Sequence, residues 1–259
     1  MPILEVRGLS KVYAPEEDGA RRVEALQTIT FAAEAGEFLA LLGPSGCGKS
    51  TLLELIAGLH TPSTGESCIH GEPIRGPHPD MGIIFQEDST FPWLTALENV
   101  EFGLRMRGVP SGQRRRQAQE MIALVGLQGF AHHYPRELSG GMRQRVAIAR
   151  TLVLHPQILL MDEPFGALDA QTRLLLGDEL LRIWEQVRAT IVFVTHDIVE
   201  AVRLSDRIIL MTARPGRIKD VVVNPLARPR DVSVITRPEF TQLVNALWEQ
   251  LREEVPRDV

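Results

Sequence analysis

Short runs of apolar residues alternate along this chain with longer segments in which apolar residues recur at helical spacing. The short runs are continuous and rich in branched side chains, a pattern typical of parallel strands that are buried on both faces. They predict five core strands, at residues 38–42, 83–85, 158–161, 191–195 and 207–211. Strands that alternate with helices in this way predict an α/β fold with a largely parallel sheet.

Three further regions surround this core. Residues 1 to about 35 contain β-like stretches broken by a turn-rich segment at 14–19, which predicts an antiparallel β subdomain. Residues 88–137 are mostly helical and separate two core strands, as an inserted α-helical subdomain would. We therefore expect one domain over 1–259, with a core formed by 36–87 and 138–220 and a C-terminal extension over 221–259.

The C-terminal extension ends in a predicted helix that starts at about Pro238. Its apolar residues recur at the spacing of one helix face, so we expect it to dock on the domain. The residues of this face are Phe240, Leu243, Val244, Leu247, Trp248 and Leu251.

Composition narrows the classes of function. Hydrophobic residues make up 44% of the 259 residues, enough for a large core, and the two cysteines, Cys47 and Cys68, match no zinc or disulfide pattern. The net charge of -5 argues against a nucleic-acid partner, which calls for a basic surface. No run reaches the roughly 18 to 20 apolar residues of a membrane span, so any membrane role needs another chain to cross the bilayer.

A glycine-rich loop follows the strand at 38–42 directly and leads into a helix predicted over 49–59. This is the sequence pattern of a P-loop, in the strand–loop–helix context that the pattern requires. Its glycines let backbone N–H groups converge on phosphate oxygens, the lysine neutralises the β- and γ-phosphates, and the serine can ligate Mg²⁺. The loop consists of Gly43, Pro44, Ser45, Gly46, Cys47, Gly48, Lys49, Ser50 and Thr51.

Two acidic residues, Asp162 and Glu163, end the apolar strand at 158–161. Ligands of α/β sheets bind beyond the carboxyl ends of the strands. Asp162 can therefore hold Mg²⁺, directly or through water, while Glu163 can act as the general base for an attacking water. Such a pair alone often only caps a helix, but with the P-loop it predicts a P-loop NTPase (RecA-like) core.

A third motif resembles the signature motif of the ATP-binding subunits of ABC transporters. It comprises Leu138, Ser139, Gly140, Gly141 and Met142, with methionine where the usual form has glutamine, and it opens a helix predicted from Met142 to about Leu154. Further family motifs lie along the chain in the order that the family has: the Q-loop at Gln86 before the signature motif, and the D-loop at Asp169 and the H-loop at His196 after it. The resemblance covers nearly the whole chain.

The resemblance implies an ATPase that uses ATP and Mg²⁺. Glu163 would be the general base, His196 would position the γ-phosphate and the water, and Gln86 would sense the metal and the water. The implied Mg²⁺ ligands are Ser50, Gln86 and Asp162. Tyr13 matches the aromatic residue that stacks on adenine, although it can also be an ordinary strand residue.

The signature motif implies a dimer. Ser139 and the two glycines place a hydroxyl and the N–H groups of a helix start at one edge of the molecule. Within one chain this second phosphate-binding surface is redundant. In the family it closes over the γ-phosphate held by the partner's P-loop, so that two ATP molecules become part of a two-fold interface. Met142 leaves the serine and both glycines intact.

Segments 85–88, 91–95, 164–169 and 210–216 resemble the ATPases of nitrate, sulfonate and taurine importers. These proteins work with an integral membrane permease and, indirectly, with an external substrate-binding protein. The resemblance thus implies a peripheral location on the cytoplasmic face of the inner membrane. Trp93 either contacts the permease or packs inside the helical subdomain. The cargo cannot be read from the sequence, because substrate choice lies in the other subunits.

Two other functions are compatible with a P-loop. An ABC ATPase that remodels or assembles a protein complex would share every hydrolytic residue, so only its partner would distinguish it. A small-molecule kinase is disfavoured because it leaves the signature motif without a role.

Overall fold

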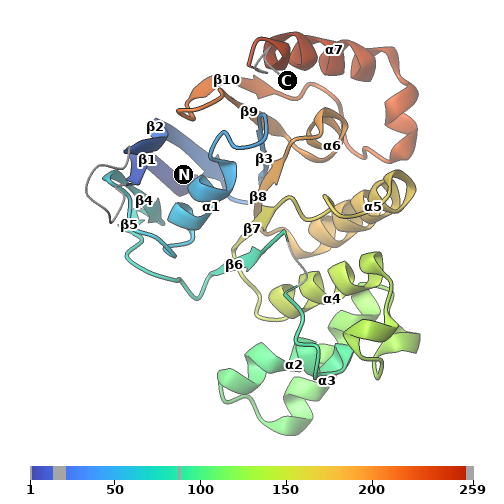
Figure 1. Cartoon of the computed structure of the whole chain (residues 1–259). Coiled ribbons are helices and arrows are strands. Elements are labelled where there is room, and N and C mark those ends of the chain that lie inside the picture. Colours follow the sequence, from blue (N-terminus) through green and yellow to red (C-terminus); the bar gives the residue numbers. More distant parts are fainter. Residues whose placement is uncertain (1, 14–21, 87–88, 255–259) are drawn as a thin grey trace. The chain divides into compact units, whose positions relative to one another are not determined.

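The computed structural model describes residues 2–13, 22–86 and 89–254 (Figure 1). The predicted turn at 14–19 and two residues of the Q-loop segment, Glu87 and Asp88, lie outside the described residues. The chain divides into two compact units. Unit 1 comprises Met1–His78 and Thr190–Val259, and unit 2 comprises Pro79–Ala189.

Unit 1 contains an antiparallel sheet with the strand order β2-β1-β4-β5. Its strands are β1 (Pro2–Tyr13), β2 (Val23–Glu34), β4 (Thr64–Ile69) and β5 (Glu72–Pro73). Buried residues such as Leu4 and Val6 alternate with more exposed ones along β1, the pattern of a sheet with one covered face. The predicted antiparallel subdomain is confirmed, and it also takes in two strands from beyond residue 35 that the sequence pattern did not assign to it.

The second sheet of unit 1 is the core of its α/β layer. Strand β3 (Phe38–Leu42) runs parallel to both β8 (Thr190–Thr195) and β9 (Arg207–Met211). Strand β10 (Ile218–Val223) pairs antiparallel with β9. Every residue of β3 and β8 is buried, which explains why their sequences read as continuous apolar runs. Helices α1 (Lys49–Ile56) and α6 (Ile198–Leu204) follow β3 and β8.

Unit 2 combines a parallel strand pair with four helices. Strand β6 (Met81–Ile84) pairs with β7 (Ile158–Asp162). The helices are α2 (Ala96–Met106), α3 (Ser111–Leu124), α4 (Gly140–Leu152) and α5 (Ala170–Val187), with short 3₁₀ turns η1 (Gln128–Phe130) and η2 (Pro135–Glu137). Helices α2, α3 and α4 pack on one another, which confirms the predicted helical insertion.

Strand β6 differs from its predicted range of 83–85. It starts two residues earlier, at Met81, and Phe85 lies outside it with 38% of its surface exposed. The sequence obscured this start because glycine is usually depleted in strands. A Cβ atom on Gly82 would lie 2.4 Å from Thr151 Cγ2, so the glycine permits close approach of α4.

The C-terminal segment docks on unit 1 through η3 (Val232–Thr236) and α7 (Pro238–Arg252). One face of α7 packs against α6, β3 and β9, and its buried members are Phe240, Leu247 and Leu251. The prediction of a docking helix is correct, but Trp248 was wrongly placed on its buried face and is 56% exposed.

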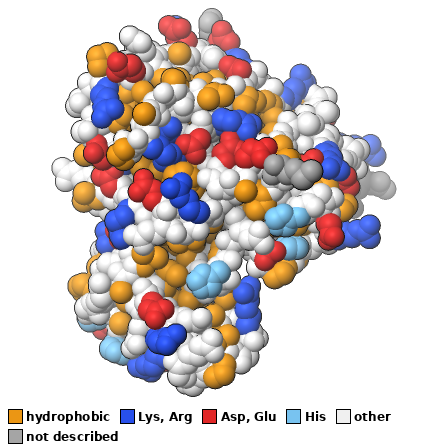
Figure 2. Space-filling model, turned by 180° about the vertical axis from the view of Figure 1, so that it is seen from behind, with side chains coloured by type: hydrophobic (Ala, Val, Ile, Leu, Met, Phe, Trp, Pro, Cys, Tyr) orange, Lys and Arg blue, Asp and Glu red, His pale blue; other side chains and the backbone are white. Residues whose placement is uncertain are grey.

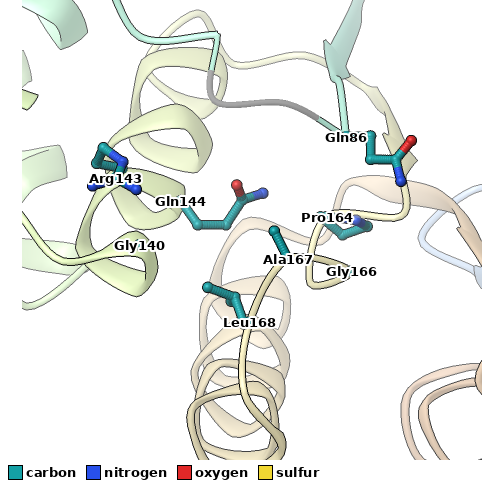
Figure 3. Close-up of a pocket in the computed structure, with 8 residues that line it drawn as sticks. All are labelled: Gln86, Gly140, Arg143, Gln144, Pro164, Gly166, Ala167 and Leu168. Carbon is teal, nitrogen blue, oxygen red and sulfur yellow. The ribbon is translucent and has the colours of Figure 1, made fainter.

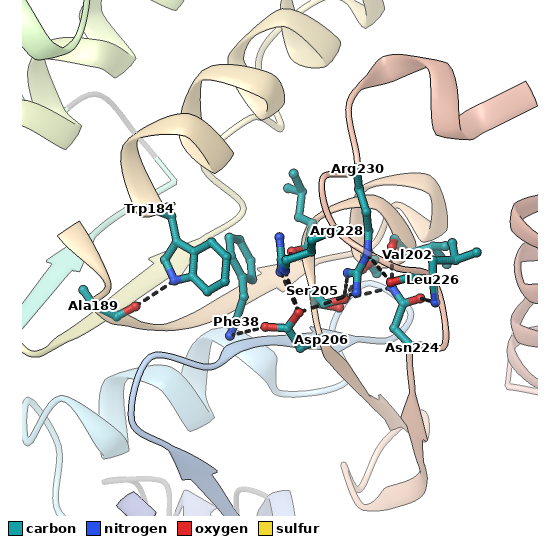
Figure 4. Close-up of polar contacts among 12 residues, drawn as sticks. Phe38, Trp184, Ala189, Val202, Ser205, Asp206, Asn224, Leu226, Arg228 and Arg230 are labelled. Carbon is teal, nitrogen blue, oxygen red and sulfur yellow. Dashed lines mark hydrogen bonds and ion pairs between the residues drawn. The ribbon is translucent and has the colours of Figure 1, made fainter. Parts of the chain in front are cut away.

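Polar contacts hold the segment between β10 and α7 in place (Figure 4). Arg228 pairs with Asp206 at 2.8 Å, and Asp206 also accepts a hydrogen bond from the Phe38 backbone N–H. The Asn224 amide donates to the carbonyls of Val202 and Ser205. These contacts fix the chain that leads into α7.

Charge is mixed over the surface. On the face shown in Figure 2, basic and acidic side chains of the described residues are interspersed and do not gather into a basic stripe. Within the part of the chain that the structure describes, none of the helices is long and apolar enough to cross a membrane.

Candidate nucleotide-binding and hydrolysis site

The predicted P-loop connects β3 to α1 in unit 1. Its backbone turns through two glycines with positive φ angles, Gly46 at +75° and Gly48 at +99°. A Cβ atom on Gly48 would lie 2.8 Å from Leu26 Cδ2 and 3.0 Å from the Ala25 carbonyl oxygen. Both the backbone angle and the crowding therefore require glycine here.

Two carbonyl groups of the loop are arranged around Lys49. This side chain is buried, and its Nζ atom donates hydrogen bonds to the carbonyls of Gly43 at 2.9 Å and Pro44 at 3.0 Å. The ammonium group is thus held across the loop, in a position to neutralise a bound phosphate. Cys47 is fully buried, as expected of a packing residue, while Ser45 and Ser50 are exposed.

Helix α1 starts without a side-chain cap. Its N-cap residue is Gly48, which has no side chain to accept the first N–H groups of the helix. A helix start of this kind offers backbone donors and the positive end of the helix dipole to an anion. The loop and α1 together have the backbone arrangement expected of a phosphate cradle.

Tyr13 and His196, two further predicted site residues, also belong to unit 1. Tyr13 is the last residue of β1 and is 41% exposed, with Lys11 Nζ 5.1 Å from its ring centroid. The exposed ring is accessible for stacking on a base. As the last residue of β1, Tyr13 also fits the alternative of an ordinary strand residue. His196 is exposed just beyond β8, where Asp197 caps α6 by accepting from Val199 N–H at 2.8 Å.

The two predicted acidic residues lie at the end of β7 in unit 2. Asp162 is the last residue of the strand and is only 8% exposed. Glu163 follows with a φ angle of +41°, in the left-handed region that residues other than glycine rarely adopt. Backbone strain of this kind is often found at functional sites, and it turns Glu163 away from the strand direction.

Gln86 and Glu163 both lie close to Gly166. A Cβ atom on Gly166 would be 3.7 Å from a Glu163 carboxylate oxygen and 3.8 Å from the Gln86 amide nitrogen. The same glycine donates its N–H to the Glu163 carbonyl at 3.0 Å. The structure therefore brings these two residues of the predicted hydrolytic set together.

Gln86 also lines a pocket of about 500 Å³ between the end of β6, the start of α4 and the loop after β7 (Figure 3). The pocket is lined by Gln86, Gly140, Arg143, Gln144, Pro164, Gly166, Ala167 and Leu168. Gln144 was missed by sequence reasoning. Its amide nitrogen is buried and has no hydrogen-bond partner among the described residues. The sequence signal that could have found Gln144 is an amide side chain on the buried face of a predicted helix, because buried polar groups normally have a hydrogen-bond partner.

The signature motif forms the start of α4. Ser139 is its N-cap, is exposed, and accepts a hydrogen bond from Met142 N–H at 3.3 Å. The helix begins at Gly140, two residues earlier than the predicted start at Met142. Leu138 is buried, and Met142 is half-buried.

The two signature glycines allow close packing with the D-loop region. A Cβ atom on Gly141 would lie 2.9 Å from Thr172 Cγ2. One on Gly140 would lie 3.2 Å from Leu168 Cδ2. Sequence reasoning had assigned these glycines to bare phosphate-facing N–H groups only, and the packing requirement is a second reason for them.

Asp169, the predicted D-loop residue, is the N-cap of α5. Its Oδ1 atom accepts from the backbone N–H groups of Gln171 at 3.1 Å and Thr172 at 3.0 Å. Hydrogen bonds from Thr172, first through its side chain, hold the pKa of Asp169 below its usual range. The carboxylate is thus ionised and fixed at the exposed start of the helix.

A strand, a glycine loop and an uncapped helix start, with a second strand that ends in acidic residues, define a P-loop nucleotide-binding protein. A family model described as "ABC transporter" matches residues 26–166. This chain belongs to the ABC transporter family, as one of its ATP-binding and ATP-hydrolysing subunits. The predicted fold class and family are confirmed.

Relatives similar to the chain over most of its length have related names. An uncharacterized ABC transporter ATP-binding protein of Methanocaldococcus jannaschii is 49% identical over 97% of this chain and 92% of the relative. An aliphatic sulfonates import ATP-binding protein of Bacillus cereus is 48% identical over 95% and 96%, respectively. A nitrate import ATP-binding protein of Synechocystis is 43% identical over 96% and 95%.

Solved structures agree with these relatives. A dimeric ATP-binding cassette in a post-hydrolysis state, bound to ADP and Pi, is 34% identical and superimposes with a TM-score of 0.74. It covers 86% of this chain and 100% of that cassette. A second dimeric cassette structure gives a TM-score of 0.75 at 35% identity.

Proposed function

We propose that this chain is the ATPase of an importer for a small anion of the nitrate, sulfonate or taurine type. Two copies would close around two ATP molecules and so drive a membrane permease. The observation that carries the proposal is the exposed, glycine-flanked helix start at Ser139, the N-cap of α4, which would be a redundant phosphate-binding surface in a chain that already has a P-loop. The importer class is supported by the relatives named for sulfonate and nitrate import.

The residues of the P-loop bind ATP in this proposal. Backbone N–H groups of the loop and of the α1 start hold the phosphates, Lys49 neutralises them, and Tyr13 stacks on the adenine. The oxygen donors Ser50, Gln86 and Asp162 suit Mg²⁺, which prefers hydroxyl, carbonyl and carboxylate ligands. When bound, Mg²⁺ neutralises charge on the phosphate oxygens.

Hydrolysis then rests on Glu163. Its carboxylate takes the proton from the attacking water. Gln86, which lies near the same glycine, Gly166, orients that water, and His196 holds the γ-phosphate. Loss of the γ-phosphate removes the contacts that exist only in the closed dimer, and the dimer opens. ATP binding and hydrolysis thereby become a closing and opening cycle.

Replacement of Glu163 by glutamine tests this cycle. Glu163→Gln keeps the size of the side chain but removes the base, so we expect ATP binding to persist and turnover to fall by about 100-fold or more. The variant should accumulate as a dimer in MgATP on gel filtration with light scattering. Glu185→Gln, an exposed glutamate on α5, is the control and should behave like the wild type. Normal turnover in Glu163→Gln, or a strictly monomeric ATP-loaded form, would contradict the proposal.

An exposed aromatic cluster on unit 2 supports the permease contact. Trp93 is 69% exposed and stacks on Phe91, with ring centroids 5.4 Å apart. The Arg150 guanidinium lies over the Phe91 ring, 4.0 Å from its centroid, and also donates a hydrogen bond to the Ser89 carbonyl. A rigid, exposed indole is a typical anchor of protein interfaces, which favours permease contact over internal packing for Trp93.

Co-purification from membranes tests this partner and separates the importer from a complex-remodelling ATPase. The tagged wild-type chain should bring down an integral membrane permease, and Trp93→Ala should reduce its recovery about tenfold while leaving the ATPase activity of the isolated subunit unchanged. Trp248→Ala, at a tryptophan on α7 of unit 1 that is 56% exposed, is the control. Recovery of assembly factors without a permease would favour the remodelling ATPase instead.

A further inference from the structure

The loop between β9 and β10, residues 212–217, contains most of the sequence motif at 210–216, which hydrolysis does not use. Its backbone is fixed to the start of β2, where Gly216 N–H donates to the Ala25 carbonyl at 3.0 Å and Gln27 N–H donates to the Gly216 carbonyl at 2.9 Å. A Cβ atom on Gly216 would lie 2.1 Å from the Cys47 carbonyl oxygen. The loop therefore lies directly against the P-loop, within unit 1.

Arg214 extends this contact through its side chain. Its Nε atom donates a hydrogen bond to the Gly46 carbonyl at 2.8 Å, between residues 168 positions apart in the sequence. Its Nη2 atom lies 3.3 Å from the position of a Cβ atom on Gly46. A guanidinium donor makes this a charge-assisted hydrogen bond to the backbone of the phosphate cradle.

The bond fixes the orientation of one peptide group in that cradle. A trans peptide is planar, so the Gly46 carbonyl and the Cys47 N–H point in opposite directions. Arg214 binds the carbonyl, and on the opposite side of the same peptide the Cys47 N–H donates a long hydrogen bond to the Pro44 carbonyl at 3.4 Å. Gly46 has a φ angle of +75° and lacks a side chain, so local sterics restrict this peptide little and these two hydrogen bonds set its orientation.

The end of α7 holds the loop that carries Arg214. A Glu254 carboxylate oxygen accepts from Ala213 N–H at 3.1 Å, and the other is 2.9 Å from Lys219 Nζ. The hydrogen bond from Lys219 lowers the pKa of Glu254, which keeps the carboxylate ionised at neutral pH. Continuous contacts thus run from the C-terminal helix through this loop to the P-loop.

We propose that Arg214 is a positioning residue for nucleotide binding: it fixes the orientation of the Gly46–Cys47 peptide in the P-loop, and Glu254 holds the loop that carries Arg214. The inference rests on the proposed role of the P-loop as the nucleotide site. It makes the C-terminal helix a part of the structure that sets the affinity for nucleotide.

Substitution at Arg214 tests the inference. Arg214→Ala should raise the KM for MgATP and the Kd for a fluorescent ATP analogue about fivefold, with kcat at saturating MgATP within about twofold of the wild type. Arg214→Gln keeps a hydrogen-bond donor but loses the positive charge, whereas Arg214→Lys keeps both a donor and the charge. Both variants should therefore bind nucleotide more tightly than Arg214→Ala. The control is Arg217→Ala, which removes the same charge from an exposed position in the same loop and should leave KM unchanged.

Glu254→Ala should raise the KM for MgATP by about twofold. The double variant Arg214→Ala/Glu254→Ala should have the same KM as Arg214→Ala, because Glu254 acts through Arg214. Thermal unfolding midpoints are measured for all variants. Wild-type KM in Arg214→Ala, or an equal rise in Arg217→Ala, overturns the inference. Lys49→Ala separates this result from failure of the proposed site: it should abolish nucleotide binding, and wild-type binding in that variant would refute the P-loop assignment itself.

Discussion

Two helix starts in this chain carry glycine-rich phosphate motifs, and their caps differ. Helix α1 begins after Gly48, in the left-handed region and without a side-chain cap. Helix α4 begins after Ser139, whose hydroxyl accepts the N–H of Met142. The first has no side chain that accepts its backbone N–H groups, whereas in the second the Ser139 hydroxyl accepts one of them.

In the function proposed above, this difference corresponds to two ways of binding one phosphate chain. The α1 start offers backbone N–H groups that no side chain caps, which suits the role of a tight primary site within the same chain. The α4 start is already capped and presents one exposed hydroxyl with glycine backbone beside it, which suits a surface that adds to a phosphate held elsewhere. The first should therefore determine binding by the monomer, and the second the closing of the dimer.

Ser139→Arg gives the largest effect expected from this comparison. A long cation at the α4 start should block dimer closure, so ATP hydrolysis should fall by about 100-fold while ATP binding by the monomer stays nearly unchanged. Steady-state hydrolysis and titration with a fluorescent ATP analogue measure the two effects. Loss of ATP binding by the monomer would show that the α4 start also serves the nucleotide of its own chain.

Two controls isolate the cause in that variant. Ser139→Ala removes the cap without adding bulk, so it should lower the stability by about 1 kcal/mol. It should reduce the rate of ATP hydrolysis far less than Ser139→Arg does. Ser111→Arg places the same cation at the exposed start of α3 and should leave hydrolysis unchanged.

The fold could be predicted where the sequence pattern is local. Strand β3 and the start of α7 at Pro238 lie where the apolar periodicity placed them. The predictions failed where a distant contact outweighs local preference. Gly82 lies inside β6 because α4 packs close to it, and α4 starts at Gly140 because Ser139 caps it, although glycine is a poor helix former.

The site followed a similar rule. The P-loop, the acidic residues and the signature motif could be named because each is contiguous in sequence and has its own chemistry. The Arg214 bond to Gly46 could not, since it joins residues that only the fold brings together. The closeness of Gln86 and Glu163 to Gly166 could not be predicted either, and nor could the packing of Gly141 against Thr172. A glycine in a motif does not reveal which neighbouring residue requires it.

Gly48→Ala tests the other side of the comparison, with a smaller expected effect. The residue has a φ angle of +99°, and its new methyl group would meet Leu26 and the Ala25 carbonyl, so the loop must shift. The backbone angle alone costs about 1–2 kcal/mol, and we expect ATP affinity of the monomer to fall about tenfold, as measured by calorimetric titration.

Gly71→Ala is the matched control for Gly48→Ala. It has a similar positive φ angle of +81° but open space around the added methyl group. It should therefore lose stability through backbone strain while binding ATP as tightly as the wild type. Equal loss of affinity in both variants would trace the effect to general destabilisation. A loss confined to Gly48→Ala would place it in the shape of the phosphate cradle, where an uncapped helix start depends on the backbone that leads into it.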